Sequence, residues 1–177
     1  MKKLVLVMVV VALLTALIAA PVMAAGKNGQ SGKSNTGHLY LYEKVRIDVG
    51  DWPIVEDGAW GKMKYNLSGA TFDFVFNGHE LDPGLDYTLI YYPDPWPGDG
   101  LICLGTGTVC EDGNIHIKNS VNTGDMPNEE DENSPEGAKI FLVPSADVDC
   151  TNQTMIGWSE SENLYEGALI AFDDTDV

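Results

Sequence analysis

The chain has 177 residues and a formal net charge of −17 at pH 7, with 27 acidic side chains against 10 basic ones. Its length suits one globular domain with a short leader. From Tyr65 onward, only Lys118 and Lys139 oppose 22 carboxylates. A surface this acidic repels nucleic acid and anionic lipid, so nucleic-acid binding is excluded as an expected function.

Residues 1–24 have the pattern of a secretory signal peptide. Lys2 and Lys3 precede an uncharged run at residues 4–20, and the small residues up to Ala24 form a cleavage site. As a helix, the run would span about 25 Å, which is short of the roughly 30 Å hydrocarbon core of a bilayer. We therefore expect cleavage, with a retained anchor helix as the alternative.

Export determines the expected location and organisation of the chain. The mature protein is expected to be secreted or held at the cell surface, and not to lie in the membrane. Residues 25–37 are rich in Gly, Ser and Asn and lack apolar periodicity, which indicates a flexible leader. One β-sandwich domain is expected at residues 38–172, followed by an acidic tail at residues 173–177.

Short alternating segments separated by turn residues predict an all-β domain. The segments are rich in β-branched and aromatic residues, and Gly, Pro, Asn and Asp lie between them. Asn77-Gly78 and Asp112-Gly113 are typical of hairpin turns. We therefore expect an immunoglobulin-like antiparallel β-sandwich of about eight strands, preceded by the signal peptide helix. The expected strands lie at residues 38–45, 59–67, 71–76, 87–92, 101–109, 115–121, 138–143 and 164–172.

The segment from Leu81 to Tyr87 has the form L-x-P-G-x-x-Y, with Pro83 at the turn. In immunoglobulin-like sandwiches this form makes a tyrosine corner, in which the tyrosine hydroxyl bonds to a backbone group upstream. The motif concerns the fold and carries no information about activity. We expect Leu81, Pro83 and Tyr87 to have this structural role.

Three cysteines allow one disulfide and leave one thiol. Cys103 lies within a predicted strand and Cys150 follows another, whereas Cys110 is next to a predicted hairpin tip and is expected to be exposed. We expect a Cys103–Cys150 bridge, which the exported location permits. The alternative is a bridge between Cys103 and Cys110.

The loop at residues 91–100 is the leading candidate contact surface. Its prolines stiffen the backbone and keep it out of a central strand. Its aromatic rings and carboxylates are suited to stack on a sugar ring and bond its hydroxyls, or to anchor a protein partner. The alternative is a structural loop that covers one end of the core. The candidate binding residues are Tyr91, Tyr92, Asp94, Trp96 and Asp99.

The segment at residues 125–136 is rich in carboxylates, the ligands that Ca²⁺ prefers. An EF-hand spacing is absent, so a solvated acidic loop is the alternative. No other cofactor is expected, because the chain has no H-E-x-x-H, G-x-S-x-G or phosphate-binding Gly-rich motif. No catalytic residue is assigned. The candidate calcium ligands are Asp125, Glu129, Asp131 and Glu136.

Two sequons for N-glycosylation occur in the mature chain, at Asn66 and at Asn152. Asn66 lies late in a predicted strand, which makes it the weaker candidate of the two. Short sequons also arise by chance, so the alternative is that neither asparagine is modified.

The chain resembles a group of uncharacterised exported proteins that are common in methanogenic archaea. The resemblance covers most of the mature chain and implies an exported or surface β-domain with no activity to carry over. It is carried by HLYLYEK (38–44), GAWGKMKYNLSG (58–69), FDFVFNGHEL (72–81), YTLIYYPDPWPG (87–98), EGAKIFLV (136–143) and DVDC (147–150).

These observations together predict a non-enzymatic binding or cell-envelope interaction module. The expected partner is an envelope protein or a glycan. One alternative is a secreted hydrolase that acts on glycans, which would need a cleft with two carboxylates about 5 to 9.5 Å apart. The other alternative is a purely structural acidic surface protein.

Overall fold

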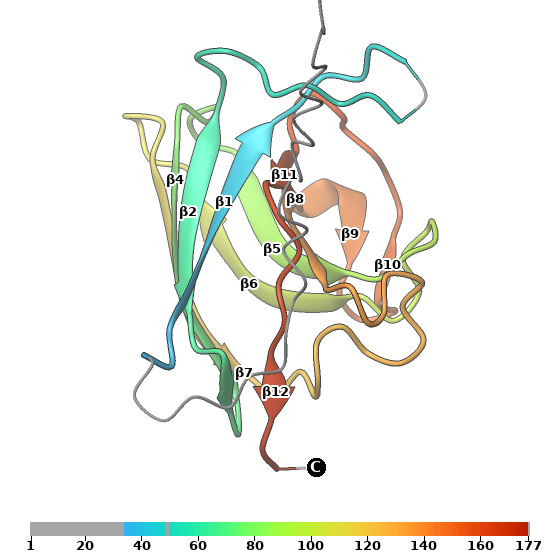
Figure 1. The fold of residues 1–177 in the computed structure, drawn as a ribbon. Helices are drawn as coiled ribbons and strands as arrows, with labels where there is room; N and C mark the ends of the chain where they lie inside the picture. Colours follow the sequence, from blue (N-terminus) through green and yellow to red (C-terminus); the bar gives the residue numbers. More distant parts are fainter. Residues whose placement is uncertain (1–33, 49, 177) are drawn as a thin grey trace, which may run out of the picture.

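The computed structural model describes residues 34–48 and 50–176 (Figure 1). The predicted signal peptide and most of the predicted leader lie outside the described residues. In the described part the protein is all-β, and no helix there has the length and apolar character needed to cross a bilayer. The strands are β1 (Gly37–Glu43), β2 (Trp60–Tyr65), β3 (Ser68–Gly69), β4 (Phe72–His79), β5 (Asp86–Tyr92), β6 (Ile102–Thr108), β7 (Ile115–Val121), β8 (Lys139–Pro144), β9 (Val148–Asp149), β10 (Thr154–Met155), β11 (Leu164–Glu166) and β12 (Asp173–Asp174).

Eight of these strands form one antiparallel sheet in the order β6-β5-β8-β11-β1-β2-β4-β7. The prediction of an antiparallel all-β fold with about eight strands is therefore confirmed. The immunoglobulin-like arrangement is corrected, because a sandwich needs two separate sheets and this sheet is continuous. β1 causes the continuity, since it pairs with β11 on one side and with β2 on the other.

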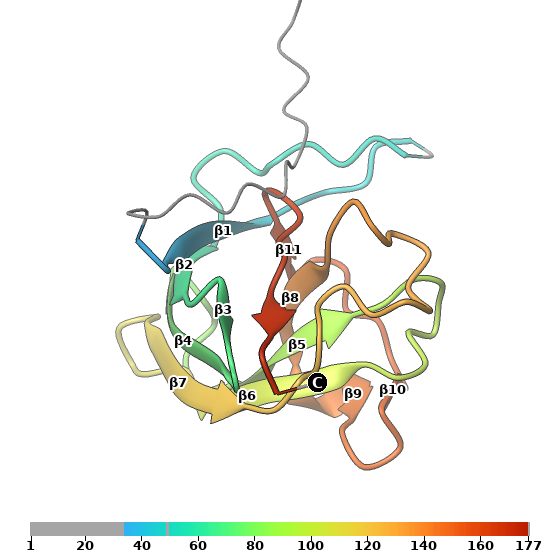
Figure 2. The ribbon, with the colours of Figure 1, turned by 60° about the horizontal axis from the view of Figure 1, so that its bottom comes forward.

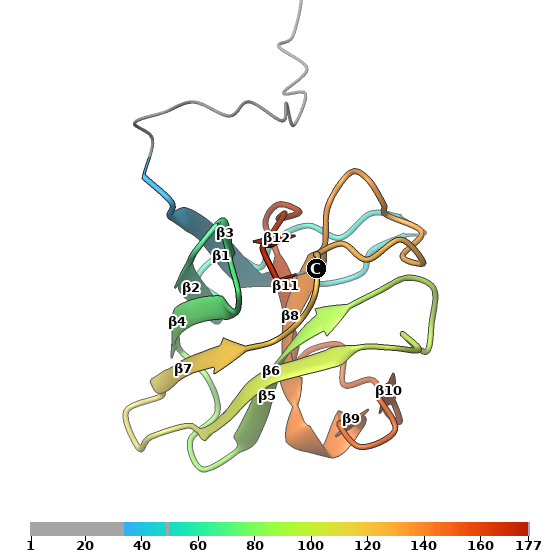
Figure 3. The same ribbon diagram turned by 90° about the horizontal axis from the view of Figure 1, so that it is seen from below.

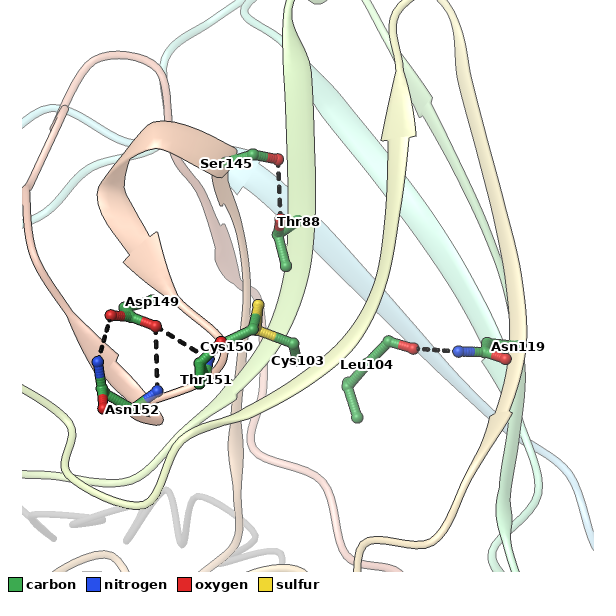
Figure 4. Close-up of a disulfide and its surroundings, with 9 residues drawn as sticks. All are labelled: Thr88, Cys103, Leu104, Asn119, Ser145, Asp149, Cys150, Thr151 and Asn152. Atoms are coloured by element: carbon green, nitrogen blue, oxygen red, sulfur yellow. Dashed lines mark hydrogen bonds between the residues drawn. A yellow bond between two sulfur atoms is a disulfide. The ribbon is translucent and has the colours of Figure 1, made fainter.

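The sheet curls into a barrel until its edge strands β6 and β7 lie side by side (Figures 2 and 3). The Asn119 side-chain amide on β7 donates to the Leu104 carbonyl on β6 at 2.7 Å (Figure 4). A methyl group at Gly105 would lie 2.8 Å from the Ile117 side chain, so glycine is needed for this approach. Short alternating strands are typical of barrels and sandwiches alike. The contacts between the edge strands β6 and β7 are what make this sheet a barrel.

The barrel interior holds the main hydrophobic core. Alternate residues point inward, as the period-two pattern of a half-buried strand requires. Phe72, Phe74 and Phe76 of β4 are all buried, and the neighbouring strands contribute Leu39, Leu41 and Met63, among others.

A second hydrophobic cluster lies on the outer face of β5 and β8, beneath β9, β10 and the segment that follows them. It explains why β5 is buried along nearly its whole length instead of alternating. The Cys103–Cys150 disulfide joins β6 to this covering segment (Figure 4), and Cys110 is a free, exposed thiol. The predicted pairing is confirmed.

The predicted tyrosine corner is present only in part. Leu81 and Tyr87 are buried in the main core, as expected. Burial raises the pKa of Tyr87 to about 12, with nearby Glu162, Asp82 and Glu43 adding to the effect. Within residues 34–48 and 50–176, however, the Tyr87 hydroxyl has no hydrogen-bond partner, so the bond that defines the corner is not formed.

Candidate binding pocket on the outer face of the barrel

A pocket of about 540 Å³ opens on the outer face of the barrel, where β5, β8 and β11 meet the segment that follows β1. We call it the aromatic pocket. Half of its lining side chains are aromatic and half are charged. The aromatic residues are Trp52, Tyr92, Trp96, Phe141, Trp158 and Tyr165, and the charged residues are Lys44, Arg46, Asp94, Lys139, Glu160 and Glu166.

The sheet supplies the floor of the aromatic pocket. Tyr92 ends β5, Phe141 lies on β8 and Tyr165 lies on β11, and all three are buried. The Phe141 ring centroid lies 5.2 Å from that of Tyr92 and 5.4 Å from that of Tyr165. Aromatic pairs at these spacings attract beyond the effect of burial alone. The floor is therefore preformed and rigid.

Three tryptophans form the walls. Trp158 packs on the floor with its ring centroid 5.9 Å from Tyr165. Trp96 meets the Trp158 ring edge to face at 5.7 Å, and Trp52 lies 5.5 Å from Tyr165 on another side. Trp96 is 55% exposed, so much of its ring is open to a ligand.

The buried carboxylate of Asp131 fixes the proline-rich loop that carries Trp96. Asp131 accepts hydrogen bonds from the Tyr91 hydroxyl at 2.8 Å and from the Asp94 backbone N–H at 3.2 Å. The Asn133 amide donates to both Asp131 and Asp94. Tyr91 is fully buried, so its prediction as a contact residue is corrected: the sheet turns its ring inward and its hydroxyl holds the loop.

The other predicted contact residues separate into two groups. Tyr92, Asp94 and Trp96 all line the aromatic pocket. Asp99 does not: it accepts a hydrogen bond from the Thr154 hydroxyl at 3.2 Å and faces a smaller hollow on the other side of the loop. Trp52 and Trp158 were missed, because they reach the pocket from distant loops and their spacing in the sequence gives no signal of convergence.

Charged groups surround the aromatic floor in a mixed pattern. Lys139 forms an ion pair with Asp94, and the Lys44 ammonium donates to the Glu166 backbone carbonyl at 2.7 Å. The Arg46 guanidinium lies 5.9 Å from the centroid of the Trp52 ring, a cation–π geometry. These three cations balance the formal charge of the three carboxyl groups that line the pocket.

Glu166 is the most perturbed carboxyl in the described part of the chain. Burial raises its pKa to about 7, and the favourable charges of Lys44 and Lys139 offset only part of that effect. Its Oε2 atom is buried and has no hydrogen-bond partner among the described residues. A buried polar atom without a partner is costly, so this oxygen is suited to bond a proton or a ligand hydroxyl.

The predicted calcium ligands are not brought together. Asp131 is committed to Tyr91 and to nearby backbone and amide N–H groups, and Asp125 accepts a hydrogen bond from the Asp174 backbone. No group of three or more His, Cys, Asp or Glu side chains in residues 34–48 and 50–176 is placed to hold a metal ion. Glu129 and Glu136 are exposed.

The two sequons differ in accessibility. The Asn66 amide is half-buried and donates to the carbonyls of Ser68 and Thr71. Asn152 is exposed in a turn, where its amide donates to the Asp149 carboxylate at 2.6 Å (Figure 4). Asn152 is therefore the more accessible acceptor, in line with the ranking expected from the sequence.

Tyr91→Phe tests the loop anchor and is expected to lower the free energy of unfolding by about 2 kcal/mol. The change removes the donor to the buried Asp131 carboxylate, and hydrogen bonds to charged groups contribute about 1.5–3 kcal/mol. Tyr87→Phe is the matched control, because its hydroxyl has no such partner, and it is expected to change stability by less than about 0.5 kcal/mol. Urea denaturation of both variants measures the difference; equal losses would contradict the anchor.

Neither a family model nor a curated protein nor a solved structure matches this chain. The geometry and chemistry of the aromatic pocket therefore carry the functional argument.

Proposed function

We propose that this protein is an exported, non-enzymatic binding domain and that its aromatic pocket holds a saccharide. The observation that carries the proposal is the convergence of three of the four tryptophans on one preformed pocket, beside a carboxyl oxygen that lacks a protein partner. The disulfide supports export, because such bonds persist in oxidising compartments.

A saccharide matches the pocket in both of its chemical features. The C–H face of a sugar ring is apolar and stacks on an aromatic side chain, and rigid rings lose little entropy when they bind. The hydroxyls of the same sugar need donors and acceptors at the rim. Asp94, Glu160 and Lys139 line the pocket and supply them, and Glu166 offers its unpartnered oxygen.

The size of the pocket favours a glycan over a protein partner. Small-ligand sites are concave and enclose about 300–1,000 Å³, and the aromatic pocket encloses about 540 Å³. A stable protein–protein interface instead buries about 800 Å² of surface on each partner. The aromatic pocket is therefore sized for one or two sugar rings.

Trp96→Ala is expected to weaken saccharide binding at least about tenfold, because a stacked tryptophan at a binding site contributes more than 1 kcal/mol. Trp60→Ala is the matched control for uncharged sugars: Trp60 is also exposed, but lies on β2, away from the pocket. Calorimetric titration with cellohexaose, chitohexaose and mannohexaose measures the effect. Equal affinities of Trp96→Ala and Trp60→Ala for these sugars, or no binding by the wild type, would contradict the proposal.

A hydrolase is the second candidate, and Glu166 is the observation that favours it. A carboxyl whose pKa is raised to about 7 by burial has the property of a general acid in glycoside hydrolysis. Mass spectrometry of the sugars recovered after these titrations separates the two functions. A binding domain returns the hexasaccharides intact, whereas shortened products from the wild type and none from Glu166→Gln would establish hydrolysis.

A further inference from the structure

The half of the barrel opposite β9 and β10 presents an open sheet face made by β1, β2, β4 and β7 (Figures 1 and 2). Strand register places its outward residues in rows across the four strands. We call this surface the basic face. Its rows are Tyr42, Trp60 and His79; Tyr40, Lys62, Asn77 and His116; and His38, Lys64, Val75 and Lys118.

The outward rows of the basic face carry three lysines and one adjoining carboxylate. The described residues include six Lys or Arg side chains, and three of them lie in these rows, as do all three histidines of the chain. The adjoining outward position on β4 is Asp73, whose carboxylate already accepts hydrogen bonds from the Thr71 and Ser120 hydroxyls. The other three cations line the aromatic pocket beside three carboxylates, so the basic face is the surface on which lysines outnumber acidic groups in a protein with a net charge of −17.

Two lysines on the basic face flank a hollow. Lys64 and Lys118 lie on either side of Val75 in the strand register, and both line a cavity of about 560 Å³. Within the described part of the chain, neither lysine forms an ion pair. Asp73 also lines the hollow, but its carboxylate is held by two hydroxyls, so the two ammonium groups are available to an anionic group that enters.

Aromatic rings lie in the other two rows of the basic face, farther along the strands from this hollow. The Tyr40 and Tyr42 rings are nearly parallel, with centroids 6.2 Å apart, and Trp60 lies 4.6 Å from the His79 ring. The Lys62 ammonium lies 5.2 Å from the centroid of the Tyr40 ring. Tyr40 is 40% exposed and Trp60 is 37% exposed, so both rings are accessible from solvent.

We propose that the basic face binds an anionic polysaccharide, at a site separate from the aromatic pocket. The lysines pair with its carboxylate or sulfate groups, and the exposed rings stack on its sugar rings. A protein partner is less well matched, because protein interface cores are depleted of lysine. The remaining acidic surface does not prevent binding, since charges beyond about 8 Å are screened at physiological ionic strength.

Lys64→Gln with Lys118→Gln tests the proposal in the full exported chain. Polygalacturonate is the probe, dextran is the uncharged comparison, and affinity is measured by biolayer interferometry at 0.15 M salt. We expect the basic face to bind polygalacturonate and not dextran, which is compared in the Trp96→Ala background so that the aromatic pocket contributes least. The double variant is expected to lose at least about tenfold in affinity for polygalacturonate. Trp96→Ala is expected to bind polygalacturonate as the wild type does, which separates this site from the aromatic pocket.

The control for net charge is Thr151→Glu with Ser161→Glu, which adds two negative charges at exposed positions away from the basic face. It is expected to retain wild-type affinity. An equal loss in this control would overturn the proposal, because the effect would then be one of overall charge. Equal binding of single-stranded DNA, or concentration-dependent self-association that the lysine substitutions abolish, would overturn it as well.

Discussion

Replacing Cys103 and Cys150 together by alanine is expected to lower the free energy of unfolding by about 4 kcal/mol. The bridge closes a loop with a sequence separation of 47 residues, and the chain-entropy model gives about that stabilisation for a loop of this length. The structure adds a local reason. The bridge ties the segment that covers the second hydrophobic cluster to β6, and the same segment leads to Trp158 in the aromatic pocket.

Denaturation in urea measures this change, with Cys110→Ala present in both proteins so that no free thiol can exchange with the bridge. Cys110→Ala alone serves as the reference, and is expected to match the wild type because Cys110 is exposed. A loss below about 1 kcal/mol would show that the covering segment is held by its apolar contacts and not by the disulfide.

Glu166→Gln is expected to raise the free energy of unfolding by about 3 kcal/mol at pH 8, and by less than about 1 kcal/mol at pH 5. Burial raises the pKa of Glu166 from its ordinary value of 4.5 to about 7. Between these values the folded protein holds a proton that the unfolded chain has lost. Stability therefore falls as the pH rises from about 4.5 to about 7, and each pKa unit corresponds to about 1.4 kcal/mol.

Glutamine at this position has no charge to bury, so the variant does not lose stability as the pH rises. Its free energy of unfolding therefore exceeds that of the wild type mainly at the higher pH. Glu129→Gln, which neutralises an exposed glutamate, is the matched control for the general loss of negative charge. Urea denaturation at the two pH values measures both variants. A gain for Glu166→Gln that is the same at pH 5 and pH 8 would contradict the buried carboxyl as its cause.

Much of the local structure could be predicted from the sequence, because strands and turns depend on nearby residues. The alternation in Phe72, Phe74 and Phe76 located β4. The hairpin turn predicted at Asn77-Gly78 was wrong, because the strand continues through both residues to His79. The predicted strand at residues 164–172 was too long, since β11 ends at Glu166 and only Ile170 and Phe172 make isolated bridges beyond it.

The global arrangement could not be predicted, because it depends on contacts between distant segments. A motif such as L-x-P-G-x-x-Y suggested a sandwich, whereas the pairing of β1 with both β2 and β11 makes one curled sheet. The Cys103–Cys150 bridge was predicted correctly, since exposure at a hairpin tip is a local property that set Cys110 apart.

The aromatic pocket was predicted only in part, because only some of its residues are neighbours in the sequence. Tyr92, Asp94 and Trp96 share one loop and were identified there, but Tyr91 points to the opposite side of the strand, as alternation requires. Trp52, Trp158 and Glu166 come from three other segments. Only the fold brings them together, so no spacing in the sequence could have revealed them.

The central claim is that a saccharide binds in the aromatic pocket, and the four tryptophans provide the most direct measurement. Each has one indole N–H signal in a ¹⁵N-resolved NMR spectrum, assigned through single Trp→Phe substitutions. Titration with the hexasaccharide of highest calorimetric affinity is predicted to shift the signals of Trp52, Trp96 and Trp158 and to leave that of Trp60 unchanged. A shift of Trp60 alone, or no shift of the three pocket signals at saturation, would contradict the account.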